Sequence, residues 1–147
     1  MNAKYATGLL LLGALASGCI NVQVTPKQSS PVVYVPGQAL SEADSLAIAE
    51  IDAAFSLAFD NSKVQMLSPV AQRPELSPLA QVHLVRRTLK DLSFENSKVH
   101  LLKLLIQNPS FSKAAKQEIL QNLKKLSFDS NKTFILKSLE DRGTLSS

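Results

Sequence analysis

The chain has 147 residues, of which 45% are hydrophobic, 19% charged and 5% aromatic, and its formal net charge is +4. This length allows one domain with or without a tail, and the apolar fraction excludes a wholly disordered chain. One cysteine excludes a disulfide scaffold, a Cys-rich zinc site and a CxxC redox pair. The charge excess is mild, so we expect no nucleic-acid partner.

The amino-terminal segment, residues 1–18, has the organisation of an export signal. Lys4 precedes an apolar run over residues 6–16, which is shorter than the ~20 residues that a membrane-spanning helix needs. Leu15-Ala16-Ser17-Gly18-Cys19 then resembles the lipobox of bacterial lipoproteins, with its leucine one residue earlier than usual. The resemblance implies cleavage after Gly18, a diacylglycerol on the sulfur of Cys19 and a third acyl chain on the new amino group. The alternative is a plain secretory signal with an incidental cysteine.

A lipidated Cys19 predicts a protein anchored in the bacterial cell envelope, because more than one acyl chain gives stable membrane attachment. Ile20 and Asn21 follow the cysteine, and no aspartate lies next to it. In a Gram-negative host this resembles sorting to the outer membrane rather than retention at the inner one.

Residues 19–40 read as the lipidated cysteine followed by a flexible linker. Residues 20–40 hold three of the seven prolines and Gly37, which disfavours helix and favours extended backbone. We expect a spacer that lifts the folded part off the membrane. The alternative is that residues 31–36 pair with the sheet edge of a partner.

Residues 41–142 contain no glycine, and their apolar spacing predicts an all-α domain. Ser41 and Ser77 are expected to cap helices, and a further helix is expected to start after Ser112. The predicted helices run from Ser41 to about Phe59, Asp60 to about Ala71, Pro78 to about Leu92, about 95–107, Ser112 to about Leu126, and Asp129 to about Glu140. The helix over 95–107 is apolar nearly all round, which predicts a central position. Residues 143–147 are expected to form a disordered tail.

A short box of residues recurs at intervals of 35 and 34 residues. Leu57-Ala58-Phe59-Asp60-Asn61-Ser62-Lys63 returns as Leu92-Ser93-Phe94-Glu95-Asn96-Ser97-Lys98 and as Leu126-Ser127-Phe128-Asp129-Ser130-Asn131-Lys132. One repeat is therefore a helical hairpin that buries its apolar face on its neighbours, which predicts five to six short helices as stacked hairpins. Either a closed bundle or an open array satisfies this pattern.

The box predicts a structural role for its residues. We expect the leucine and the phenylalanine to hold the corner in the core, and the acid to accept hydrogen bonds from free amides at the start of its helix. The lysines at positions 63, 98 and 132 gain nothing from the helix dipole there, so pairing with an acid on an adjacent hairpin is their expected role. Three equivalent lysines argue against the alternative of a catalytic lysine.

These Phe-Asp-x-x-Lys boxes between leucine-rich helices resemble a bacterial domain-of-unknown-function family with repeated F-[DS]-x-x-K hairpins, over about residues 55–140. Its members are often exported or lipid-anchored, and the resemblance implies neither an enzymatic role nor a cofactor. The period of 34 is also that of tetratricopeptide repeats, but their Trp, Leu-Gly and Tyr pattern is missing.

Residue patterns that carry chemistry are scarce. His83 and His100 lie on predicted helices outside any metal-ligand spacing, so structural or surface roles are expected for them. The glycine-free domain has no GxSxG elbow and no phosphate-binding glycine loop. We therefore expect no catalytic residues, no metal and no cofactor.

The charge distribution is uneven along the chain. Residues 41–60 hold five acids and no base, whereas residues 61–147 hold 14 bases and seven acids. The first helix is therefore expected to pack on the later hairpins partly through opposite charges. Arg86, Arg87 and Lys90 form a candidate patch for an anionic partner such as lipid headgroups or a cell-wall polymer, and the alternative is an ordinary solvated face.

Together these patterns predict a non-catalytic, lipid-anchored envelope protein whose helical repeats bind an envelope protein or an anionic envelope polymer. The alternative is a carrier of a small hydrophobic ligand or lipid, with a cavity lined by Leu101, Leu105 and their neighbours. The sequence leaves the oligomeric state open.

Overall fold

The computed structural model describes residues 40–144, which belong to a compact unit, Gly37–Ser147. The described residues are helical and include no strand, as the sequence predicts. The helices are α1 (Glu42–Phe55), α2 (Asp60–Ala71), α3 (Pro78–Asp91), α4 (Glu95–Gln107), α5 (Lys113–Asn122), a 3-10 turn η1 (Leu123–Lys125) and α6 (Asp129–Thr144).

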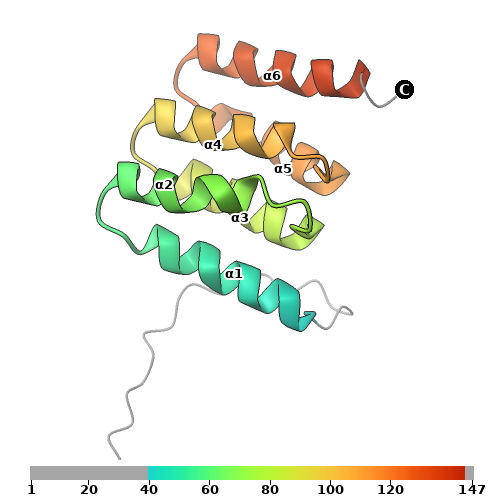
Figure 1. The fold of residues 1–147 in the computed structure, drawn as a ribbon. Helices are drawn as coiled ribbons and strands as arrows, with labels where there is room; N and C mark the ends of the chain where they lie inside the picture. The colour runs from blue at the N-terminus through green and yellow to red at the C-terminus, as the bar shows by residue number, and fades with distance from the viewer. Residues whose placement is uncertain (1–39, 145–147) are drawn as a thin grey trace, which may run out of the picture. The chain divides into compact units, whose positions relative to one another are not determined.

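The helices form three hairpins, α1–α2, α3–α4 and α5–α6, stacked in a two-layer array (Figure 1). Helix α3 packs against α1 and α5 in one layer, and α4 packs against α2 and α6 in the other. Each hairpin therefore contacts the next one along the chain, which is the architecture of an open repeat array rather than of a closed bundle. The central position predicted for α4 is confirmed.

Serine side chains begin the first helix of each hairpin, as predicted for Ser41 and Ser77. The hydroxyl oxygens of Ser41, Ser77 and Ser112 accept hydrogen bonds from the amides of Asp44, Ala80 and Ala115, at 3.0, 3.2 and 3.1 Å. Each bond satisfies an amide that has no partner within its helix. Pro78 lies at the first helical position of α3, where its missing amide hydrogen costs nothing.

The apolar seams of the six helices meet in one core. Its most completely buried side chains include Ile51, Leu67, Leu101, Ile119 and Ile135. Three residues that the apolar spacing predicts to be buried are instead exposed: Leu79 and Phe134, each 41% exposed, and Ala58, which lies beyond the end of α1.

Three helix ends differ from the prediction. Helix α5 ends at Asn122 rather than near Leu126, because Leu123–Lys125 form the 3-10 turn η1. Helix α1 ends at Phe55 rather than Phe59, where the amide of Ser56 turns back to the carbonyl oxygens of Asp52 and Ala53. Helix α6 continues past Glu140 through Gly143 to Thr144, two residues that we expected in the tail. Residues 145–147 lie outside the described part.

Two buried amide side chains join the hairpins at the edge where α2 meets α3 and α4 meets α5. The Asn108 side-chain nitrogen donates to the carbonyl oxygens of Ala71 and Arg73, at 2.8 and 2.9 Å. Gln81 donates to the carbonyl oxygens of Leu76 and Ser110, at 2.7 and 2.8 Å, and accepts from the amide of Ser112 at 2.8 Å. These bonds fix one turn against the next.

Candidate functional site

The acid of the first repeat box bonds to the following hairpin rather than to its own helix. The Asp60 carboxylate accepts hydrogen bonds from the amides of Ser93 and Phe94, at 2.7 and 2.8 Å. Its side chain is only 4% exposed. Asp60 therefore satisfies free amides at the start of α4, and the expectation that it would satisfy amides of its own helix was wrong.

Glu95 occupies the same place in the second box. Burial disfavours its charged form, but hydrogen bonds from the Ser127 amide and the Asn131 side chain, together with the charge of Lys98, outweigh burial and lower the pKa of Glu95. The Asn131 nitrogen lies 3.3 Å from the Glu95 carboxylate. Glu95 thus links the second hairpin to the third as Asp60 links the first to the second.

In the third box the acid has no further described hairpin to bind. The Asp129 side chain is 94% exposed, and its nearest cation is Lys132 at 2.9 Å. The hydrogen bond and charge of Lys132 lower the pKa of Asp129.

Each box lysine pairs with the acid of its own box. The distances from the lysine nitrogen to the carboxylate are 3.7 Å for Lys63–Asp60, 3.5 Å for Lys98–Glu95 and 2.9 Å for Lys132–Asp129. Lys63 also donates to the carbonyl oxygen of Asp91 at 3.2 Å. Asp91 is the last residue of α3, so this cation lies where the helix dipole favours it. The prediction that these lysines pair with an acid on an adjacent hairpin was wrong, because each pairs with the acid of its own box and Lys63 reaches the next hairpin only at a backbone carbonyl.

The phenylalanines of the three boxes are exposed. Phe59, Phe94 and Phe128 have 75%, 67% and 60% of their surface accessible. The expectation that they hold the corners in the core was wrong. Leu92 and Leu126 do so, whereas Leu57 of the first box is 38% exposed, so the expectation was also wrong for that leucine.

These three phenylalanines form a row, which we call the phenylalanine edge. Phe59 and Phe94 directly precede α2 and α4, and Phe128 directly precedes α6. All three therefore lie where the two helices of a hairpin join, at the left in Figure 1. Stacked helices lie 8–10 Å apart, so the row extends over roughly 20 Å. A row of exposed aromatic side chains along one edge marks a candidate interaction site.

The candidate basic patch is largely engaged within the protein. Arg86 lies 2.9 Å from Glu118 of α5, whose hydrogen bond raises the pKa of Arg86. Arg87 lies 3.2 Å from Asp52 of α1 and 2.6 Å from Asp91, and its guanidinium stacks over the Phe55 ring. Lys90 is exposed.

The charge complementarity predicted for α1 is present in the structure. Asp52 contacts both His83, at 2.8 Å, and Arg87. Glu50 makes two 2.9 Å hydrogen bonds with the guanidinium of Arg73, which raise the pKa of Arg73. His83 is therefore held by α1, whereas His100 is exposed on α4. Within residues 40–144 no three His, Cys, Asp or Glu side chains gather as a metal site would need.

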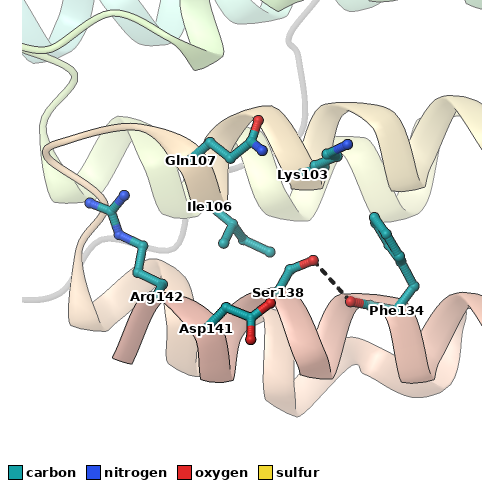
Figure 2. A pocket seen from close by; sticks show the side chains of 7 residues that line it. All are labelled: Lys103, Ile106, Gln107, Phe134, Ser138, Asp141 and Arg142. Carbon is teal, nitrogen blue, oxygen red and sulfur yellow. Dashed lines mark hydrogen bonds between the residues drawn. The ribbon is translucent and has the colours of Figure 1, made fainter. Parts of the chain in front are cut away.

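A surface pocket of about 410 Å³ lies between α4 and α6 (Figure 2). Lys103 and Phe134 face each other across it, with the ammonium nitrogen 5.7 Å from the ring centroid. Ile106 forms its apolar floor, and Asp141 and Arg142 lie at its other end. Leu101 and Leu105, which were expected to line a carrier cavity, are not among its lining residues and are packed in the core.

The predicted signal peptide, Gly18, Cys19 and residues 20–39 of the predicted linker lie outside the described residues. In the part of the chain that the structure describes, no helix has the length and apolarity needed to cross a membrane. Comparison with protein-family models, curated proteins and solved structures gave no match. The lipobox and the F-[DS]-x-x-K resemblance therefore stay predictions.

Proposed function

We propose that this chain is a lipid-anchored protein of the bacterial cell envelope whose helical repeats bind another envelope component without catalysing a reaction. The anchor is Cys19, and in a Gram-negative host the membrane is the outer one. Acyl chains at one end and an array of stacked hairpins at the other would present a fixed surface at high local concentration.

The observation that supports this proposal is the phenylalanine edge. Its three phenylalanines are more than half exposed, although the box that contains them supplies the contacts between hairpins. Burying such a ring against a partner contributes ~1.5–3 kcal/mol, so three rings supply a substantial part of a binding energy. Stacking of the hairpins does not need the rings to be exposed, which favours a binding role for them.

The proposed partner is a protein or an anionic polymer of the envelope. Exposed lysines lie near the phenylalanine edge, with Lys90 before the second turn and Lys124 and Lys125 before the third. A surface that combines aromatic rings with lysines suits a partner with apolar and acidic groups. The carrier alternative is less favoured, because Leu101 and Leu105 pack in the core.

Two measurements test the proposal. Mass spectrometry of the chain isolated from bacterial membranes should find a mature amino terminus at Cys19 that carries acyl chains, and Cys19→Ala should release the protein from the membrane fraction. An unmodified thiol in the membrane-bound protein would overturn the anchor.

The binding role is tested by a photo-crosslinking residue placed at position 94, with position 79 as the control, because Leu79 is also exposed but lies away from the phenylalanine edge. We expect a discrete adduct from position 94, its loss on Phe59→Ser with Phe128→Ser, and no such adduct from position 79. Equal adducts from both positions would overturn the role of the phenylalanine edge.

A further inference from the structure

Neighbouring hairpins of the array are joined by a contact between two different faces. One of these faces is exposed on the first described hairpin and the other on the third. Positions 67, 102 and 136 are equivalent in the three hairpins, by the same shifts of 35 and 34 residues as the boxes. Leu67 and Leu102 are 0% and 1% exposed, whereas Leu136 is 44% exposed. In the first two hairpins the following hairpin covers this position, and no described helix covers it in the third.

The opposite side of the repeat shows the converse pattern. Met66, Leu101 and Ile135 occupy equivalent positions, and their exposures are 56%, 1% and 0%. The hairpins that contain Leu101 and Ile135 each follow another hairpin, whereas Met66 belongs to the first described hairpin. We call the surface around Met66 the head face and the surface around Leu136 the tail face.

The hydrogen-bonding groups at the two ends show the same pattern as the apolar side chains. Asp60 accepts hydrogen bonds from the amides of Ser93 and Phe94 in the next hairpin. The equivalent acceptor on the tail face is Asp129, which is 94% exposed, and the equivalent amides are those of Ala58 and Phe59 at the head. An acceptor at the tail and its matching amides at the head are thus both available in every copy of the chain.

The charges of the two end hairpins are opposite. The first hairpin, residues 42–71, holds five acids and one base, whereas the third, residues 113–144, holds seven bases and four acids. Ion pairs already cross the boundaries between hairpins inside one chain, from Asp52 to Arg87 and from Arg86 to Glu118. The basic third hairpin of one copy would likewise attract the acidic first hairpin of another copy.

We propose that the tail face of one copy stacks on the head face of a second copy, so that the hairpin array continues from chain to chain. This inference goes beyond the proposed function and depends on neither the lipid anchor nor the phenylalanine edge. Because the two faces differ, the contact is heterologous and does not close on itself, so it builds chains of copies rather than only dimers.

The contact is expected to be reversible. Thr133 and Glu140 occupy the tail-face positions equivalent to Val99 and Ile106, so this face is less apolar than an internal boundary. Crowding of copies on a membrane would favour an association of this strength.

The test is analytical ultracentrifugation of the full chain carrying Cys19→Ala, in which no acyl chain or thiol contributes to association. Its average mass is expected to rise beyond that of a dimer as the concentration increases, and to fall when salt is added. Met66→Glu disables the head face and Leu136→Glu disables the tail face, so each variant alone should be monomeric. Leu79→Glu in the middle hairpin, whose leucine is exposed to a similar degree, should associate like the parent.

An equimolar mixture of the two end variants distinguishes the geometry, because one retains a head and the other a tail. We expect the mixture to form dimers and nothing larger. A monomeric parent at all concentrations would overturn the proposal. Association that survives both end variants would also overturn it, because the contact would then lie elsewhere, for example in the leader. Association that is lost with Leu136→Glu but kept with Met66→Glu would indicate a symmetric tail-to-tail contact and would overturn it too. Circular dichroism confirms that each variant is helical.

Discussion

The carboxylate of Asp60 lies 2.7 Å from the amide nitrogen of Ser93, so a side chain that begins the second helix fixes the turn before the fourth. The contact crosses 33 residues of sequence and joins two hairpins at their shared edge. Asp60 therefore stabilises the array rather than one helix.

Replacing Asp60 tests this role directly. Asp60→Ala removes the buried carboxylate that accepts two hydrogen bonds from the turn before α4, so the free energy of unfolding should fall by about 1–3 kcal/mol. Asp129→Ala is the matched control, because Asp129 occupies the same box position but is exposed, and its replacement should lower the free energy of unfolding much less than Asp60→Ala does. Urea unfolding followed by circular dichroism measures both. Equal losses would show that the contact between hairpins is not what Asp60 contributes.

The lowered pKa of Glu95 predicts a dependence of stability on pH. Because the folded pKa is below the ordinary value, the unfolded chain takes up the proton first, and the stability that Glu95 contributes is lost as pH falls through the folded pKa. Glu95→Gln should therefore flatten the decline in unfolding free energy between about pH 5 and pH 3.

Urea midpoints across this pH range measure the effect. Glu140→Gln, on the exposed side of α6, serves as the control and should follow the parent. If the curves of Glu95→Gln and of the parent run parallel, the pKa of Glu95 does not differ between the folded and unfolded states.

We expect the phenylalanines of the phenylalanine edge to contribute to binding but not to the stability of the fold. Because the rings are exposed, Phe59→Ser, Phe94→Ser and Phe128→Ser should each change the unfolding free energy by no more than about 0.5 kcal/mol. Leu126→Ala, two residues before Phe128 but fully buried, should cost about 2–5 kcal/mol. Thermal and urea unfolding decide between these outcomes, and a large loss from the serine variants would assign the rings to the fold.

Asn108 is predicted to be among the most sensitive polar positions. It is 2% exposed, and its side chain donates to two carbonyl oxygens and accepts from the amide of Ser110. Asn108→Ala leaves these groups without partners and should cost about 2–3 kcal/mol. Asn96→Ala, on the exposed side of α4, should be nearly neutral in the same unfolding measurement. A neutral Asn108→Ala would mean that water replaces the lost partners.

Local signals were sufficient to predict most of the fold. Serines at positions 41, 77 and 112 located three helix starts, and the self-similar boxes located the other three. The spacing of apolar residues identified most of the buried seam. Neither signal could distinguish a bundle from an array, because both satisfy the same local contacts.

The roles of the site residues were harder to predict. Whether Phe94 faces the core or the solvent depends on how the turn leaves α3, which no pattern in the box encodes. Asp60 was expected to cap its own helix because capping is local, whereas its real partners depend on how the hairpins stack. Gln81 and Asn108 gave no signal, since single amides among apolar residues have no distinctive spacing.

The contact from one box to the next also makes the molecule extensible. Duplicating residues 95–128 would insert a complete α4–α5 unit whose own acid meets the amides of the turn that follows, as Glu95 meets Ser127. Such an insertion would lengthen the rod by about one helix diameter, ~10 Å, without creating an unmatched boundary. Genetic duplication could thus adjust how far this protein reaches while leaving the hydrogen bonds at every joint intact.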